Sequence, residues 1–532
     1  MKNAAIALLL GFCLAAVGCH AQTRPLSINA ISEGKTTANN TIPSYNSAFG
    51  YGTNMGYYPP HSDEQIAEFA SRLGINTLRP ALFEHFVEKW GYDMRLEAFR
   101  QYEKLGMRDL VCFIGYPSDA HRDKTVYCGK DTSTLFANLY EPIWQADGSV
   151  NPHNFYANYV FKTVKTYGRW VKFWEIWNEP DFATTYKTEM APGLPGAWWN
   201  TNPDPCEYTL HAPVQHYIRM LRVSYEVIKS VDSTAFVAIG GIGFPSFLDV
   251  ILRQTDNPDG GRETPQYPNG GGAYFDVVSF HSYPHIDNSV REWSDKLVGF
   301  QYFRHSDRAV EGIFKRKNAL QDVLKKHGYD GSKFPQKPFM ITESNIPAAE
   351  RDVFMGSYEA QRNFILKALV KSQMNGVLQF HPYSIGELKT VKYMRNEFDV
   401  MGLFHPLEGI KPDAAEPTES GIAYRTTVEL LKNHRFDAAE TRRLNLPPEA
   451  DGAAFRDTTT GDVVYCLWAK TTVDKSENAA TTFSFAPLSI GSVQQYIWDF
   501  WQTKTVATLD GKAVRLTGAP AFFRKIILKK GR

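Results

Sequence analysis

The chain has 532 residues, of which 58 are basic and 57 acidic, so its formal net charge is +1. A chain of this length is longer than one that usually folds around a single hydrophobic core, which favours two domains. The balanced charge argues against a protein that binds nucleic acid or an anionic membrane by general electrostatic attraction.

Residues 1–22 have the pattern of a targeting segment, in which Lys2 is followed by an apolar stretch too short to span a bilayer. We therefore expect an exported protein that is periplasmic, attached to the cell surface or secreted. Gly18-Cys19 resembles a bacterial lipoprotein cleavage box, although Ala16 stands where leucine is usual. A lipidated Cys19 would tether the chain to a membrane, whereas ordinary cleavage after Ala21 would release it.

Residues 23–45 are polar and are expected to form a linker or a strand lent to a second domain. From there to residue 435, strand patterns alternate with helix patterns, which is typical of a parallel sheet. Eight such units favour a closed (β/α)8 TIM barrel over residues 46–435, of the α/β class. A doubly wound open sheet is the alternative, but the first strand is not followed by a glycine-rich phosphate loop. The expected strands cover 47–54, 75–82, 109–116, 170–179, 235–244, 274–283, 338–343 and 376–383, and the expected helices 62–73, 96–105, 155–167, 214–231, 245–253, 307–327, 358–375 and 418–431.

Two of these strands end in a glutamate. Trp177-Asn178-Glu179-Pro180 closes the fourth strand, and Ile341-Thr342-Glu343 closes the seventh. The carboxyl ends of barrel strands carry the chemistry of this fold. A glycosidase needs two carboxyl groups, one to protonate the leaving oxygen and one to attack the sugar or to activate water. A salt-bridged structural role is the alternative for either glutamate alone.

Both segments resemble the signatures of clan A retaining glycoside hydrolases, in which Glu179 would be the acid/base and Glu343 the nucleophile. Residues 275–284 resemble the strand-six motif of family thirty-nine, the β-xylosidase and iduronidase family. The resemblance covers about residues 45–435 as an order of motifs. It implies that Asn178 hydrogen-bonds the sugar 2-hydroxyl, and a turn residue is the alternative.

The same resemblance implies three further residues at the nucleophile. Arg79 would support its carboxylate by charge and fork geometry, and Tyr283 would donate a hydrogen bond to it. His281 would line the same pocket, with a satisfied core histidine as the alternative. Glu175 shares a strand face with Glu179 and is expected to be a buried partner of Arg79.

The remaining substrate-binding candidates are less specific. The eighth strand lacks the tryptophan that many clan members use as the floor of the −1 subsite, so Phe380 or His381 is expected to replace it. Long connections at 117–153, 180–212 and 254–273 are expected to build a cleft wall on the catalytic face. Candidate stacking residues in the loops of that face are Trp198, Trp199, Tyr116, Tyr57 and Tyr58.

The cysteines allow one disulfide and suggest no metal site. Cys128 and Cys206 lie in loops on the same predicted face, where an exported protein permits them to pair. Cys112 and Cys466 lie in apolar strand-like runs and are expected to be buried. No Cys/His cluster has zinc spacing, and neither a metal nor a cofactor is expected.

Residues 436–532 have the pattern of an antiparallel β-sandwich, with short apolar runs separated by turn residues. Such a domain could bind carbohydrate or act as a buttress for the barrel, and we favour the buttress.

The sequence thus predicts a retaining glycoside hydrolase that cleaves β-glycosidic bonds of a polysaccharide or oligosaccharide by double displacement, with long loops favouring endo-action. An exo-acting β-xylosidase or uronidase is the alternative. A non-catalytic carbohydrate-binding protein on a barrel scaffold is the alternative of another class. The sugar, the linkage and the oligomeric state stay open.

Overall fold

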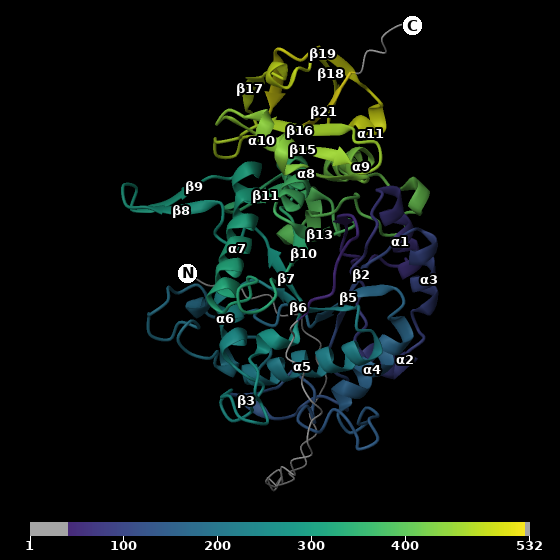
Figure 1. The fold of residues 1–532 in the computed structure, drawn as a ribbon, viewed down its shortest axis with the longest axis vertical. Coiled ribbons are helices and arrows are strands. Elements are labelled where there is room, and N and C mark those ends of the chain that lie inside the picture. Colours follow the sequence, from purple (N-terminus) through teal and green to yellow (C-terminus); the bar gives the residue numbers. More distant parts are fainter. Residues whose placement is uncertain (1–40, 527–532) are drawn as a thin grey trace.

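The computed structural model describes residues 41–526, in which helices surround a curled, fully parallel seven-stranded sheet (Figure 1). The predicted signal segment and Cys19 lie outside the described residues. The strand order is β1-β13-β10-β7-β6-β5-β2. The strands are β1 (Gly50–Tyr51), β2 (Leu110–Ile114), β5 (Val171–Ile176), β6 (Phe236–Ile242), β7 (Val277–Ser282), β10 (Phe339–Ser344) and β13 (Val377–Pro382).

The segment 75–82, predicted as a strand, makes only isolated bridges. Asn54 bridges to Arg79 on one side, and Phe113 bridges to Ala81 on the other, both in parallel register. The segment therefore lies between the two edge strands β1 and β2, where an eighth strand would pair. Pro80 lacks a backbone N–H group, which limits the ladder that this segment can form.

The helices follow the predicted alternation within one or two residues at most ends. Ser62 caps α1 through a capping box with Gln65, which explains why this helix begins where the pattern indicated. One short helix, α2, follows the segment 75–82 and was not predicted. The helices of this part are α1 (Asp63–Arg72), α2 (Glu84–Trp90), α3 (Leu96–Lys104), α4 (Phe155–Tyr167), α5 (Val214–Val231), α6 (Pro245–Arg253), α7 (Ser306–Lys326), α8 (Tyr358–Met374) and α9 (Glu419–Leu431).

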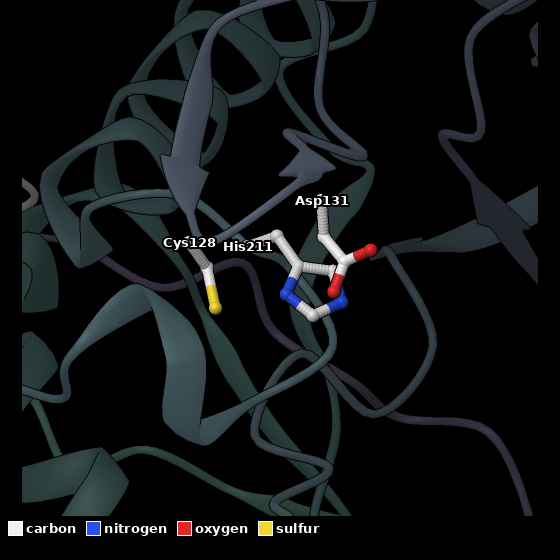
Figure 2. Close-up of side chains that lie close together, drawn as sticks. All are labelled: Cys128, Asp131 and His211. Atoms are coloured by element: carbon white, nitrogen blue, oxygen red, sulfur yellow. The ribbon is translucent and has the colours of Figure 1, made fainter.

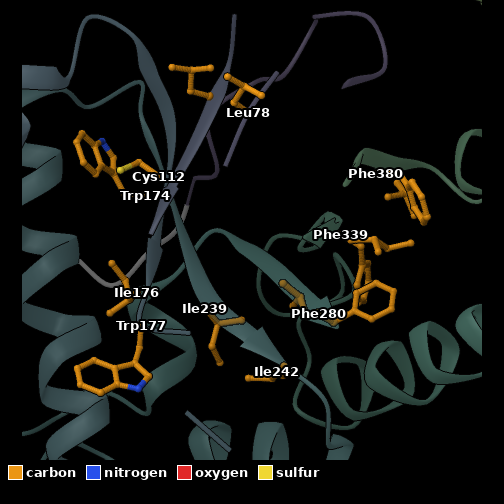
Figure 3. Close-up of a cluster of buried hydrophobic side chains, with 14 of the residues drawn as sticks. Leu78, Cys112, Trp174, Ile176, Trp177, Ile239, Ile242, Phe280, Phe339 and Phe380 are labelled. Carbon is orange, nitrogen blue, oxygen red and sulfur yellow. The ribbon is translucent and has the colours of Figure 1, made fainter. Parts of the chain in front are cut away.

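Both faces of the sheet are buried, and successive strand residues contribute to opposite faces. Cys112 and Trp174 belong to the main core, together with the other rings and aliphatic side chains of Figure 3. Their neighbours Val111 and Phe173 belong to a separate inner cluster. Tyr45 packs its ring against Phe173 at 5.3 Å, so the described end of the predicted linker lies against this inner cluster.

The C-terminal part forms a six-stranded antiparallel sheet, ordered β14-β15-β16-β21-β18-β19, and a two-stranded ribbon, β17-β20. Both contribute to one hydrophobic cluster, which includes Phe483 of the ribbon and Phe523 of the sheet. The elements are β14 (His434–Phe436), α10 (Ala438–Leu444), β15 (Ala450–Asp457), β16 (Val463–Ala469), β17 (Ala480–Phe483), β18 (Ser492–Tyr496), α11 (Phe500–Thr503), β19 (Ala507–Asp510), β20 (Val514–Thr517) and β21 (Ala521–Lys525).

Three small hairpins decorate the loops. They are β3 (Val126–Cys128) with β4 (Asp131–Thr132), β8 (Arg291–Ser294) with β9 (Gly299–Tyr302), and β11 (Ala349–Arg351) with β12 (Phe354–Ser357). The β8–β9 hairpin projects away from the body of the molecule (Figure 1). No helix within residues 41–526 is long and apolar enough to cross a membrane.

The long connections do not all rise on one face. Residues 254–273 follow α6 and precede β7, so they connect a helix to a strand and begin at the opposite end of the sheet from the strand-to-helix loops. Asp256 in this connection pairs with Arg219 and Arg222 of α5. The prediction that this connection builds a catalytic cleft wall is therefore wrong.

Candidate active site

Glu179 and Glu343 lie at the ends of β5 and β10 and face each other. One carboxylate oxygen of each, together with a ring nitrogen of His281, lies within 4.8 Å of the others. The Glu343 side chain is 12% exposed and that of Glu179 is 29% exposed. Folding therefore brings the two strand-end glutamates into one site.

Arg79 connects the nucleophile candidate to its surroundings. Its Nη1 donates to Glu343 at 2.6 Å and to Asn54 at 3.1 Å, and its Nη2 donates to Asn178 at 2.7 Å. Its Nε donates to Glu175 at 2.6 Å, which is the predicted buried ion pair. One guanidinium thus orients four acceptors at once, which its planar fork allows.

Tyr283 and His281 bind the two glutamates from β7 and the residue that follows it. The Tyr283 hydroxyl donates to Glu343 at 2.6 Å, and His281 Nδ1 lies 2.7 Å from Glu179. Burial raises the pKa of Glu343, but the charges of His281 and Arg79 and the hydrogen bonds of Tyr283 and Arg79 outweigh it, so the net shift is downward. Burial lowers the pKa of His281, but the neighbouring carboxylates outweigh it and raise it.

Beneath this pair lies a layer of buried polar groups that the sequence did not reveal. Ser279 and Thr342 both donate to Glu175, and His281 Nε2 lies 3.1 Å from the Thr342 hydroxyl. Each of these side chains points inward at a position two residues before a site residue or adjacent to one. The period of two in β7 could have identified Ser279, which lies two residues before His281. It could not have identified Thr342, because the pairing of β10 with β7 shifts register between Ile341 and Glu343.

The backbone around Glu179 is unusual. Trp177 and Glu179 have φ angles of 74° and 50°, in the left-handed region that side chains with a Cβ rarely adopt. The Glu179 N–H donates to the Gly240 carbonyl at 2.8 Å, which holds this turn against β6. Gly241 has φ 57°, and a Cβ there would lie 2.3 Å from His281 Nε2, so glycine is required for the approach.

Tyr116 is the aromatic candidate that the structure brings to the site. Its ring stacks on Trp177 with centroids 4.2 Å apart, and its hydroxyl lies 3.5 Å from the Asn178 carbonyl. Burial raises the pKa of its hydroxyl, with smaller effects from Arg79, Glu179 and Glu343.

A cavity of about 200 Å³ adjoins Glu179 and Tyr283. Its other lining residues include Phe182, Phe244 and Ile286, so its surface is mainly apolar. Asp181, which no sequence pattern indicated, also lines this cavity and accepts hydrogen bonds from the backbone of Gly243 and Phe244. Burial raises the pKa of Asp181 to about 7 against the effect of these two hydrogen bonds.

Three predicted substrate-binding residues, Trp198, Trp199 and His381, do not line the candidate active site. Trp198 is fully buried and donates to Glu207, while Arg253 of α6 binds the carbonyls of Trp198 and Trp199. Both tryptophans thus lie beside α6, outside the sheet. His381 is fully buried inside the sheet with Nε2 2.9 Å from Gln379, and burial lowers its pKa to about 3.

Strand β13 instead brings a residue beyond His381, Tyr383, to the candidate active site. The ring of Tyr383 lies 6.3 Å from Tyr283 and 5.8 Å from Phe398, so these aromatic rings form one wall of the site. The expectations that Phe380 or His381 replaces the missing tryptophan are therefore wrong, because both are fully buried. Of the two adjacent tyrosines, Tyr58 is buried and Tyr57 is 77% exposed.

Side chains with metal-ligating atoms come together at three places within residues 41–526, and protein partners engage atoms at each of them. The predicted Cys128–Cys206 disulfide is present, which removes the thiol from the group of Cys128, Asp131 and His211 shown in Figure 2. Glu84 and His121 form an ion pair with each other. His281 lies within hydrogen-bond distance of Glu179 through one ring nitrogen and of Thr342 through the other.

Solved structures with a similar fold are glycoside hydrolases. A family 39 glycoside hydrolase from Bacteroides cellulosilyticus WH2 aligns with a TM-score of 0.57 and 17% identity over 90% of this chain and 81% of the other. A family 30 subfamily 8 xylanase from Clostridium acetobutylicum gives 0.48 and 13%, covering 91% and 96%. A family 51 α-L-arabinofuranosidase from Bifidobacterium longum gives 0.48 and 12%, covering 91% and 97%.

No family model matches the sequence, and no curated protein matches it. The similarity to the family 39 structure therefore establishes the fold. The resemblance that three short motifs suggested extends to the architecture that carries them.

Proposed function

We propose that this protein is a retaining glycoside hydrolase that cleaves β-glycosidic bonds by double displacement. The observation that carries the proposal is the approach of Glu179 and Glu343 to within 4.8 Å, measured between carboxylate oxygens. Retaining enzymes hold their two carboxyl groups about 5–5.5 Å apart, whereas inverting enzymes need about 6.5–9.5 Å to admit a water molecule. The fold shared with a family 39 glycoside hydrolase supports the same conclusion.

In the first step, a Glu343 oxygen attacks the anomeric carbon while Glu179 transfers its proton to the leaving glycosidic oxygen. The glycosidic bond breaks and a glycosyl ester forms on Glu343. In the second step, Glu179 takes a proton from water, whose oxygen attacks the same carbon and releases Glu343 as a carboxylate. Glu179 is protonated again at the end, so the cycle balances.

The neighbouring groups suit these roles. Arg79 and Tyr283 both bind Glu343, and the lowered pKa of Glu343 keeps it ionised as a nucleophile must be. Arg79 holds Asn178 next to the acid/base, where Asn178 would hydrogen-bond the 2-hydroxyl of the sugar. The substrate would be a polysaccharide or oligosaccharide, and the antiparallel C-terminal part would be a sandwich that supports the barrel.

Two variants test the roles of the glutamates. Glu343→Ala should lower turnover of an aryl β-glycoside by roughly a thousandfold or more, since no covalent intermediate can form. Glu179→Ala should slow glycosides with poor leaving groups far more than 2,4-dinitrophenyl glycosides, which need no protonation. Azide should restore turnover of Glu179→Ala with formation of a β-glycosyl azide. The exposed Glu408→Ala is the matched control.

Full turnover by Glu343→Ala would overturn the nucleophile assignment. Equal slowing of activated and poor leaving groups by Glu179→Ala would overturn the acid role. A wild-type protein that binds glycans but turns over none of a panel of aryl β-glycosides and polysaccharides would favour the non-catalytic alternative. Product profiles on xylan, β-glucans, mannan and agar-type galactans would separate endo-action from the exo-acting alternative.

A further inference from the structure

A line of touching aromatic rings leads from the catalytic centre to the surface of α2. Tyr116, which stacks on Trp177, lies 4.4 Å from Phe83 between ring centroids. Phe83 lies 5.5 Å from Phe86, and Phe86 lies 5.3 Å from Trp90. We call Tyr116, Phe83, Phe86 and Trp90 the aromatic track.

The helix turns this track outward. Phe83 is the N-cap residue of α2, and Phe86 and Trp90 follow three and seven positions later, which places them on one helical face. An apolar stripe with this spacing normally faces the core. Here α2 buries Glu84 and Val87 instead, while Phe83 and Phe86 are half-buried and Trp90 is 53% exposed. Contiguous apolar surface of this kind marks an interaction site.

The track is held rigidly against the loop that carries Tyr116. The backbone N–H groups of Glu84 and His85 donate to the carbonyls of Gly115 and Tyr116. The buried Glu84 carboxylate accepts a hydrogen bond from the Ser118 N–H and pairs with His121 in the same loop. Because these contacts fix α2, a ligand would meet a preformed surface and would lose little ordering entropy.

The position of the track relative to the cavity assigns it to one side of the scissile bond. The cavity beside Glu179 lies at the ends of β5, β6 and β7, on the side where an acid/base protonates the leaving group. The track lies on the other side of Glu179, beside β2 and the segment 75–82. These two segments are neighbours, since Phe113 of β2 forms a bridge with Ala81. Sugar units on the track would therefore belong to the glycone side.

We propose that the aromatic track binds consecutive sugar units of a polysaccharide on the glycone side, so that the enzyme cleaves within a chain. This inference rests on the proposed function. Sugar rings present C–H faces that pack on flat aromatic surfaces, and a series of such surfaces suits a chain better than a single terminal residue. Lys89 Nζ lies 4.7 Å from the centroid of the Trp90 ring, and 53% of Trp90 stays exposed to a ligand.

The test compares Trp90→Ala with Trp293→Ala. Trp293 is 57% exposed on the β8–β9 hairpin, and Phe300 is the aromatic ring it meets within the described part of the chain. The readout is the ratio of kcat/KM on the best soluble polysaccharide among arabinoxylan, β-glucan and glucomannan to kcat/KM on the matching aryl glycoside. Trp90→Ala should lower this ratio about three- to tenfold, as loss of one stacking contact implies. Trp293→Ala should leave the ratio unchanged, and Trp90→Phe should restore most of it.

Affinity electrophoresis of Glu343→Ala in gels containing the same polysaccharide gives a readout without turnover, and adding Trp90→Ala should weaken the retardation by the same factor, about three- to tenfold in apparent affinity. Three outcomes would overturn the proposal: an unchanged ratio in Trp90→Ala, cleavage of aryl glycosides but of no polysaccharide, or a wild-type dimer that Trp90→Ala dissociates. In each of these the glycosidase assignment still stands. Loss of activity on both the polysaccharide and the aryl glycoside in Glu343→Ala tests the proposed function and does not test the aromatic track.

Discussion

At the scale of single residues, the site depends on how one buried cation is shared. Arg79 is 3% exposed and contacts Glu175 and Glu343, two carboxylates that would repel each other without it. An arginine buried in this way must be paired, because an isolated charge in a protein interior is costly. The second carboxylate, Glu175, therefore serves to hold Arg79, and Arg79 holds Glu343, the proposed nucleophile.

Tyr283→Phe removes the hydrogen bond to Glu343, the proposed nucleophile, and leaves the rest of the site in place. The hydroxyl of Tyr283 lowers the pKa of Glu343 by binding its charged form. Its removal should raise the pKa of Glu343, so the acidic limb of kcat/KM against pH should move upward by about one pH unit. The profile of an aryl β-glycoside would show this shift. An unchanged acidic limb would mean that Tyr283 only fills space, and Tyr302→Phe, which lies on the β8–β9 hairpin, is the control.

The motifs predicted the acidic residues and their immediate partners because each lies at a strand end. His381 failed as a candidate because it lies inside β13, two residues before Tyr383. The alternation of side chains along the strand points it to the same side as Gln379, against which it is buried. Trp198 failed because its loop folds back onto α6, and such tertiary contacts leave no local pattern in the sequence. The left-handed backbone at Trp177 and Glu179 was equally invisible, since it depends on β6 beside it.

At the scale of elements, the disulfide joins two loops that start from neighbouring strands. Cys128 ends β3 in the connection after β2, and Cys206 lies in the connection after β5, 78 residues away. Closing a loop of this length in the unfolded chain stabilises the native state by at most about 4–5 kcal/mol. Cys112 and Cys466 are buried free thiols, and burial raises the pKa of both.

A reducing agent should therefore lower the stability of the protein only by breaking the Cys128–Cys206 disulfide. The double variant Cys128→Ser/Cys206→Ser should lower the unfolding temperature and increase hydrogen exchange in residues 117–153 and 180–212, and reducing agent should have the same effect on the wild type but none on the variant. Differential scanning calorimetry with and without reductant checks this. Equal sensitivity of the variant to reductant would contradict the assignment.

The pattern of elements was predictable where apolar residues recur at helical spacing over many residues, as in α5 and α7. It was not predictable for α2, which is short and turns its aromatic stripe away from the core, against the rule by which helices are recognised. The segment 75–82 has the composition of a strand, but Pro80 lacks a backbone N–H group and the segment makes isolated bridges to its neighbours on both sides.

At the scale of the whole molecule, the parallel sheet and the C-terminal sheet share one hydrophobic core. This core contains Phe364 of α8 and Trp468 of β16, among many residues of both parts. A buried polar network joins the same parts, because Asp307 of α7 binds Lys367 of α8 and also accepts from the Trp468 indole and from Thr471. Loss of either part would leave apolar surface and charges of the other uncovered.

Asp307→Ala should therefore destabilise the entire chain in a single unfolding transition. The change leaves the Lys367 ammonium buried without its carboxylate, which costs about 3–5 kcal/mol. Burial raises the pKa of Asp307, but Lys367 and the other donors outweigh it, so the folded pKa lies below the ordinary 3.8. The stabilisation is thus complete above about pH 4 and is lost as the pH falls through the lowered value. Calorimetry should show one transition, shifted strongly at pH 7 and less at pH 3, whereas the exposed Asp322→Ala on the same helix should change little. Two separate transitions, only one of them shifted, would show that the two sheets unfold independently.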